Sequence, residues 1–182
     1  MKMTKALVAA GLAVMLGAGT ASAEDGKIGL GYQGVFGGDP LNLNGVSARY
    51  WFNKNVGGEL NVFYGAVGAS RNSVNVGNAD LFLGTAKVLY APVVKQNSKF
   101  YVGLEGGYGS VSGDWIPSSV DVTLWTVTPF MGAEYSFAGL PELGLNFEVG
   151  YRMHHVDTSW PGTDLNIHVN GTFVSLGAHY YL

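Results

Sequence analysis

Apolar and polar residues alternate with a period of two along most of the chain, and no segment after residue 23 shows a convincing helical period. The clearest segment covers residues 144–154. Apolar or aromatic side chains occupy every second position there from Leu145 to Met153, and the positions between them include Glu148 and Arg152. Because successive side chains of a strand point to opposite faces, such a segment indicates a strand with one apolar and one polar face. The pattern predicts eight strands, near residues 27–36, 44–52, 56–66, 80–91, 99–111, 122–137, 143–156 and 166–182.

The connections between these strands alternate in length. Short ones cover residues 53–55, 92–98 and 138–142, and mostly longer, more polar ones cover residues 37–43, 67–79, 112–121 and 157–165. Short turns at one end, long loops at the other and an even number of strands are typical of β-barrels in bacterial outer membranes. We therefore predict an all-β fold, an eight-stranded antiparallel up-and-down transmembrane β-barrel, with both termini at the short-turn, periplasmic end.

Aromatic residues on the apolar faces gather beside the predicted short turns and the C-terminus. They are Tyr50, Phe52, Tyr90, Phe100, Tyr135, Phe137 and Tyr180. Aromatic rings favour the headgroup layer of a membrane, where one part of the ring is apolar and the other meets water. In a soluble domain these rings would be scattered core residues, so their clustering favours a girdle at one membrane interface.

The polar faces of the predicted strands carry charges of both signs. The charged residues are Arg49, Glu59, Lys87, Glu105, Glu134, Glu148 and Arg152. An eight-stranded barrel has an interior just wide enough for side chains to fill it. Charges enclosed there must pair, because an isolated buried charge is very costly. We therefore expect these seven residues to form an ion-pair network that fills the lumen.

The first residues have the features of an export signal. Lys2 and Lys5 precede an apolar run, and the small residues Ala21 and Ala23 flank Ser22, so we expect signal-peptidase cleavage before Glu24. The expected domains are a cleaved signal peptide, residues 1–23, and an outer-membrane barrel, residues 24–182. Since both lysines leave with the signal, the mature chain is more acidic than the formal net charge of −3 for the whole chain. This balance disfavours nucleic acid as a partner.

Composition excludes several other classes of protein. Charged residues make up 13% of the chain and aromatic residues another 13%, which argues against disorder. No stretch of the mature chain approaches 18 consecutive apolar residues, so we expect no membrane-spanning helix. The chain contains no cysteine, so neither disulfide bonds nor a lipoprotein anchor can hold it.

The last eight residues, 175–182, are similar to the C-terminal β-signal of outer-membrane proteins. Gly177, Tyr180 and Leu182 occupy the positions of the glycine, the aromatic residue and the final hydrophobic residue, with Leu182 where phenylalanine is usual. Residues 100–109 and 128–135 also resemble strands of the small outer-membrane β-barrel domain family, which includes opacity-type surface proteins and the membrane domain of outer membrane protein A. The resemblance implies that the barrel-assembly machinery reads the signal and that outer-membrane lipid and lipopolysaccharide surround the barrel. It implies no single activity, because members include adhesins and structural proteins.

One polar cluster, residues 154–159, could suggest catalysis. The lipid A deacylases are similar barrels with a membrane-facing histidine, a serine two residues away and a supporting acid. Here Asp157 stands two residues after His155, and Val156 stands two after His154, so the nucleophile is missing. Thr158 and Ser159 lie toward the predicted loop. We expect these residues to be structural and the protein to have no enzymatic activity.

No cofactor or metal site is expected either. His154 and His155 point to opposite faces of one strand, and His168 and His179 have no ligand spacing. The glycine-rich segments 29–31 and 103–109 precede no helix, so a phosphate-binding loop is not indicated.

The long loops are the expected place of specificity, because exposed loops on a rigid scaffold commonly carry function. Arg71, Trp115 and Trp160 lie in three of them and are the candidate contacts with an extracellular or envelope partner. Three functions stay open: a structural or adhesin-like surface barrel, a narrow channel or conduit for small hydrophobic solutes, and a lipid A-modifying membrane enzyme. We favour the first, since the lumen is expected to be filled and no catalytic set is present.

Overall fold

The computed structural model describes residues 26–36, 43–71, 74–114, 121–160 and 163–182, with the backbone alone at residues 67–71, 74–77, 121, 159–160 and 163–165. The predicted leader, residues 1–23, and its cleavage position before Glu24 lie outside these residues. Within the part of the chain that is described, no helix has the length and apolar character needed to span a membrane.

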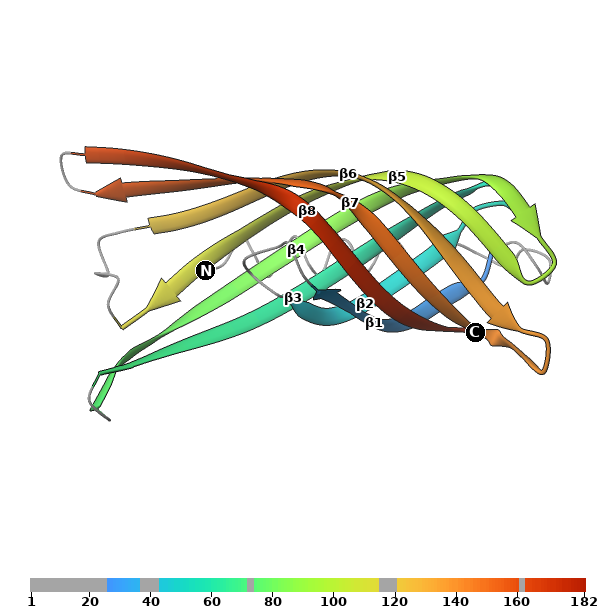
Figure 1. The fold of residues 1–182 in the computed structure, drawn as a ribbon, viewed down its shortest axis with the longest axis horizontal. Helices are drawn as coiled ribbons and strands as arrows, with labels where there is room; N and C mark the ends of the chain where they lie inside the picture. The colour runs from blue at the N-terminus through green and yellow to red at the C-terminus, as the bar shows by residue number, and fades with distance from the viewer. Residues whose placement is uncertain (1–25, 37–42, 72–73, 115–120, 161–162) are drawn as a thin grey trace.

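The described residues form a closed, wholly antiparallel barrel of eight strands, which confirms the predicted fold (Figure 1). The strands are β1 (Ile28–Phe36), β2 (Asn44–Trp51), β3 (Val56–Arg71), β4 (Val74–Lys95), β5 (Ser98–Gly113), β6 (Asp121–Phe137), β7 (Leu140–Trp160) and β8 (Thr163–Tyr181). Each strand pairs with the next one in the chain, and β1 pairs with β8 to close the ring, from Gly29 opposite Tyr181 to Phe36 opposite Val174. Closure leaves no free sheet edge along the shared length of the strands.

The short connections all lie at the end of the barrel that carries the C-terminus, on the right in Figure 1. They join β2 to β3, β4 to β5 and β6 to β7. The predicted aromatic girdle lies on the outer surface beside these turns, with Phe52, Tyr90 and Tyr180 each about half exposed or more. The layout therefore matches the alternation of short and long connections in the sequence.

Two of the predicted long loops are instead extended hairpins. β3 continues to Arg71 and β4 begins at Val74, so most of segment 67–79 is strand. Likewise β7 continues to Trp160 and β8 begins at Thr163, so segment 157–165 is mostly strand. Backbone pairing continues there although the apolar alternation fades. Because a hairpin that projects from the barrel meets water on both faces, neither face needs to be apolar.

The other two predicted loops lie partly outside the described residues. β5 extends through residues 112 and 113 of segment 112–121, and Leu43 of segment 37–43 is buried and accepts a hydrogen bond from the backbone of Val35 (2.8 Å). At the opposite end, the predicted turn 92–98 is mostly strand, because β4 passes Pro92 through a register shift between Tyr90 and Val93. A proline cannot donate to the ladder, so it is tolerated at such an irregularity.

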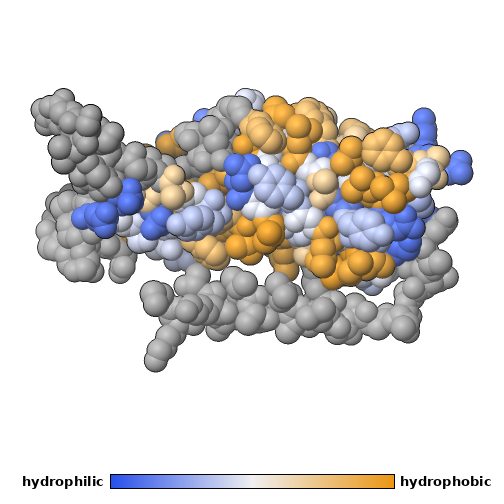
Figure 2. All heavy atoms as spheres, turned by 90° about the horizontal axis from the view of Figure 1, so that it is seen from below, coloured by the Kyte–Doolittle hydropathy of each residue, from blue (hydrophilic) through white to orange (hydrophobic). Residues whose placement is uncertain are grey.

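The outer surface of the barrel is apolar around its middle, where Figure 2 shows hydrophobic side chains gathered on the visible face. Val88, Leu104 and Met131 are 66%, 55% and 51% exposed. Their neighbours along each strand, such as Lys87 and Glu105, are buried inside the ring. A soluble barrel has the opposite arrangement, so this distribution indicates a barrel whose surrounding solvent is lipid.

We expect Leu104→Arg to destabilise the folded barrel in phosphatidylcholine bilayers by about 2–4 kcal/mol, the cost of a basic side chain on the lipid face near mid-membrane. Leu104 lies midway between the exposed aromatic residues Phe100 and Tyr108 of β5. Reversible urea unfolding followed by tryptophan fluorescence measures this difference. Ala138→Arg, in the exposed turn between β6 and β7, is the matched control and should leave stability nearly unchanged. Equal unfolding midpoints for the two variants would show that the apolar surface does not face lipid.

Candidate functional site

The seven charged residues that the sequence predicts for the lumen all lie inside the barrel. Each is at most 5% exposed, and the set comprises Arg49, Glu59, Lys87, Glu105, Glu134, Glu148 and Arg152. They come from β2, β3, β4, β5, β6 and β7, where they alternate with the exposed apolar residues of the same strands. The structure therefore brings together in one cluster residues that the sequence placed on six separate strands.

Arg49 is the centre of this cluster. Its guanidinium donates to Glu59 on the neighbouring strand β3 (Nε to Oε2, 2.6 Å). It also donates to Glu134 on β6 (2.5 Å) and to Glu148 on β7 (3.0 Å). Since β2 is paired only with β1 and β3, the contacts with β6 and β7 cross the lumen instead of following the wall.

Lys87 and Arg152 extend the cluster along the barrel. The Nζ atom of Lys87 lies 2.8 Å from Glu59 and 2.6 Å from Glu148, so Lys87 also joins β4 to β7 across the interior. Arg152 on β7 contacts Glu105 on β5 (2.7 Å) and donates to the hydroxyl of Thr128 (3.2 Å). Every carboxylate of the cluster therefore has a cationic partner, as burial of charge requires.

Neutral donors complete the coordination of the carboxylates. Glu148 accepts hydrogen bonds from Tyr101 (2.9 Å), Gln33 (3.2 Å) and Ser175 (3.2 Å). Glu134 accepts one from the hydroxyl of Tyr181 (2.8 Å). Sequence reasoning missed these donors because they carry no charge. Their position on the polar face of their strands was the signal that could have identified them.

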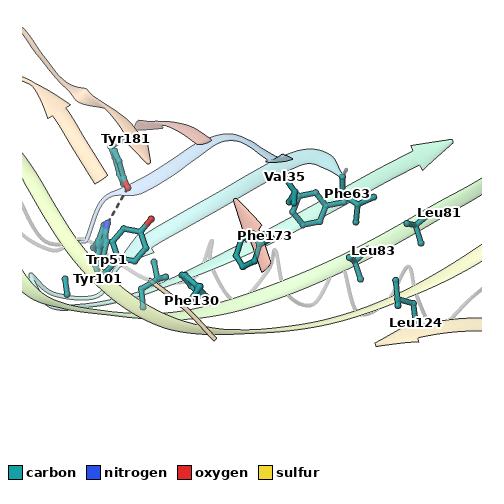
Figure 3. Close-up of a cluster of buried hydrophobic side chains, with 13 residues drawn as sticks. Val35, Trp51, Phe63, Leu81, Leu83, Tyr101, Leu124, Phe130, Phe173 and Tyr181 are labelled. Atoms are coloured by element: carbon teal, nitrogen blue, oxygen red, sulfur yellow. Dashed lines mark hydrogen bonds between the residues drawn. The ribbon is translucent and has the colours of Figure 1, made fainter. Parts of the chain in front are cut away.

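A second layer of buried side chains fills the lumen beyond the charged cluster. It is mostly apolar, and Figure 3 shows Val35, Phe63, Leu83 and Phe173 in it, each at most 2% exposed. His154, the next inward residue of β7 beyond Arg152, is a buried polar residue in the same half of the lumen. The two layers meet where Arg152 lies over the Phe173 ring (4.6 Å to the centroid) and Lys87 lies over the Phe130 ring (5.2 Å). These are cation–π distances, so the cations at the boundary interact favourably with both layers.

The two adjacent histidines of β7, His154 and His155, point to opposite sides of the barrel wall. His154 is buried inside, whereas His155 stacks on Trp125 (3.7 Å between ring centroids) and meets His168 edge-on (4.3 Å). Asp157 is exposed, and the side chain of Ser159 lies outside the described part of the structure. Among the residues that are described, no group of three or more histidine or acidic side chains is arranged to hold a metal ion.

The remaining predicted site residues fall into two groups. Of the proposed assembly signal, Tyr180 and Leu182 are exposed on the outside, while a side chain at Gly177 would collide with Gln33 and Asn146 in the lumen. Packing inside the lumen is therefore a second reason for a glycine at position 177, besides the proposed signal. Of the proposed loop contacts, Trp115 lies outside the described residues, and Arg71 and Trp160 are described only as the ends of β3 and β7.

Comparison with known proteins gives a result at the level of the fold. No protein-family model matches the chain, and no curated protein matches it in sequence. Solved structures do match. The outer membrane protein AlkL is 18% identical with a TM-score of 0.55, and the match covers 91% of this chain and 94% of AlkL. The outer membrane protein OprG from Pseudomonas aeruginosa is 17% identical with a TM-score of 0.58, covering 88% and 96%.

A third match has the same character. A major outer membrane protein from Thermus thermophilus is 13% identical with a TM-score of 0.51, covering 88% of this chain and all of that one (100%). The chain has the fold of the small outer-membrane β-barrels. At these identities the similarity shows a shared fold and does not show a shared function.

We expect Arg49→Met to destabilise the barrel by about 3–5 kcal/mol, because it leaves buried carboxylates without their central cation. Urea unfolding in lipid bilayers measures the loss. Lys54→Met is the matched control, since it removes a cation from an exposed turn residue and should cost little. A variant Arg49→Met as stable as Lys54→Met would show that the cluster does not hold the interior together.

Proposed function

We propose that the protein is a non-enzymatic integral outer-membrane barrel with an occluded lumen, which acts as a structural or surface-interaction protein through the end opposite its short turns. One observation carries the proposal. The ion pairs of Arg49 with Glu134 and Glu148 join opposite walls of the ring, so they lie across the path that a solute would follow. The apolar layer around Phe63 and Phe173 occupies the lumen beyond them.

The extended hairpins support a role in surface contact. β3–β4 and β7–β8 run well past the ends of β1 and β2, whose lengths are 9 and 8 residues against 22 for β4 and 21 for β7. In Figure 1 these two hairpins project at the end opposite the C-terminus. In the proposed orientation both termini are periplasmic. Arg71 and Trp160, at the ends of β3 and β7, and Trp115, between β5 and β6 in the chain, are the proposed contacts with an extracellular or envelope partner.

The membrane and the assembly machinery are the other proposed partners. The apolar surface is suited to outer-membrane lipid and lipopolysaccharide. Gly177, Tyr180 and Leu182 are proposed as the signal read by the barrel-assembly machinery. No catalytic role is assigned, because His155 is engaged with Trp125 and His168 and has no nucleophile two residues away. Release of acyl chains from lipopolysaccharide by the purified protein would contradict this part of the proposal.

A conduit for small hydrophobic solutes is the second candidate function. The apolar layer favours it, since side chains such as Leu83 and Leu124 give that half of the lumen an apolar lining. The charged cluster argues against passage along the whole barrel axis, because an apolar solute would have to displace paired charges. Uptake of an apolar dye by vesicles that contain the protein distinguishes the two functions.

We expect the purified protein to show negligible steady single-channel current in planar lipid bilayers, since charged and apolar side chains occupy its lumen. A general porin in the same bilayers is the positive control. Correct insertion is checked by the shift in gel mobility between heated and unheated samples. A large, steady current from the folded protein would defeat the proposal of an occluded lumen.

We expect deletion of the β3–β4 hairpin tip, residues 68–77, to reduce binding of expressing bacteria to host cells while the barrel still folds, because this segment lies beyond the shared wall of the barrel. Adhesion counts measure the effect, and heat-modifiable gel mobility confirms folding. A matched deletion of residues 138–139, in the turn at the opposite end, should leave adhesion unchanged. Unchanged adhesion after removal of both extended hairpins would contradict the surface role.

A further inference from the structure

A cavity of about 500 Å³ opens at the short-turn end of the barrel, on the opposite side of the charged cluster from the apolar layer. The turns between β2 and β3 and between β4 and β5 form its rim, with Lys54, Asn55, Gln96 and Asn97. Lys99 of β5, Ser136 of β6 and Pro141 of β7 continue the wall. Cavities of roughly 300–1,000 Å³ commonly bind small molecules, so this one has the size of a ligand site.

The floor of this cavity, which we call the mouth pocket, is closed by a chain of hydrogen bonds. Trp51 Nε1 donates to the hydroxyl of Tyr181 (3.3 Å), and that hydroxyl donates to Glu134 (2.8 Å). Figure 3 shows the Trp51 and Tyr181 side chains pointing toward each other. Glu134 is in turn bound by Arg49 (2.5 Å), so the floor is fixed to the charged cluster. A ligand that enters the mouth pocket therefore meets a closed floor and not an open channel.

The lining of the mouth pocket is strongly basic. Lys27, Lys54, Lys95 and Lys99 line it, and among the described lining residues Glu134 is the one carboxylate. Glu134 is also paired with Arg49 of the charged cluster, so four lysines share one carboxylate at this site. Lys99 lies opposite Glu134 in the strand register, and its Nζ is 4.0 Å from the centroid of the Trp51 ring, which holds this ammonium over the floor.

The described lysines of the protein lie at this end and in the lumen. After residue 25 the chain has five lysines; four line the mouth pocket, and the other, Lys87, belongs to the charged cluster. Asp80, Asp114 and Asp157 lie toward the opposite end, whereas Glu142 lies at the short-turn end, next to the pocket residue Pro141, but does not line the pocket. A cleft lined by charges of one sign focuses the electric field and raises the local concentration of counter-ions.

We propose that the mouth pocket binds a small soluble polyanion that carries phosphate groups. Several ammonium groups around one concavity repel each other, and a multivalent anion relieves that repulsion. Lysine is a common phosphate ligand because its ammonium is a compact charge with three donors. A soluble source is favoured over a lipid headgroup because the pocket lies inside the strand wall. The membrane-facing aromatics Tyr90, Phe100 and Tyr135 lie on the outer side of that wall.

This inference goes beyond the proposed surface role, because the mouth pocket lies at the opposite end of the barrel from the extended hairpins. The surface contacts can fail their own test without affecting it, whereas an open lumen would also remove the closed floor of the mouth pocket. The mouth pocket depends only on the turns, on the lysines and on the closed floor.

The test is isothermal titration of the folded, full-length mature protein with inorganic pyrophosphate in an uncharged detergent. We expect saturable binding that weakens as salt increases. The variant Lys54→Gln/Lys95→Gln should bind roughly tenfold more weakly or worse, since two charged donors are lost. Its matched control, Lys54→Arg/Lys95→Arg, keeps both charges and should retain most of the affinity. Unchanged affinity in the glutamine variant, or no saturable binding by the wild type, overturns the proposal.

A second arm separates the soluble from the lipid source. The protein is placed in nanodiscs of phosphatidylcholine alone or with phosphatidylglycerol, and the pyrophosphate titration is repeated at constant ionic strength. Similar affinity in both supports a soluble ligand. If phosphatidylglycerol abolishes pyrophosphate binding, the headgroup occupies the mouth pocket and the soluble assignment is wrong. Both variants are first checked for heat-modifiable gel mobility, so that loss of binding is not loss of folding.

Discussion

Arg49 connects carboxylates of three strands, and much of the interior is arranged around its guanidinium. The reason lies in the exterior: where hydrocarbon surrounds the barrel, charged side chains can be placed only inside. An eight-stranded ring is too narrow to keep those charges apart or hydrated. They therefore have to pair across the lumen, and a guanidinium with several donors can contact both walls at once. The apolar surface and the closed interior are consequences of the same constraint.

The interior has a layered order along the barrel axis. The charged cluster is bounded on one side by Trp51 and Tyr181 and on the other by Phe130 and Phe173. Aromatic rings on both sides limit the access of water to the ion pairs. Electrostatic interactions are stronger in such a medium than in water, and so is the cost of losing any one partner. The layers thus make the cluster both rigid and sensitive to substitution.

The sequence predicts the barrel well because a strand that separates lipid from a polar lumen needs strict alternation. The parity of Leu145, Glu148 and Arg152 was enough to place all three correctly. The same parity could not identify the apolar layer, since Phe63 and Leu83 occupy inward positions, which elsewhere in the barrel are largely polar. The alternation of apolar and polar residues shows which side chains point inward, but it does not show how the inward side chains are layered along the barrel axis.

Neither the ion-pair partner of each charged residue nor the lengths of the hairpins could be predicted from the sequence. The partner of each charge depends on strand register, which brings Arg49 within reach of Glu134 although 85 residues separate them. The hairpins β3–β4 and β7–β8 extend past the alternating region because backbone pairing continues without a buried face. The mouth pocket could not be predicted either, because its lining residues come from two turns and several strand ends that are far apart in the sequence.

The junction of β1 and β8 has a consequence for how the barrel forms. All other neighbouring strands are consecutive in the chain and can pair as soon as both are made. The junction alone unites segments about as far apart as the chain allows, with Gly29 opposite Tyr181. Bringing such distant segments together carries the largest loop-closure entropy, and pairings of this kind slow folding. We therefore expect the pairing of β1 with β8 to be the last step of assembly, and until it forms both strands have an unpaired edge.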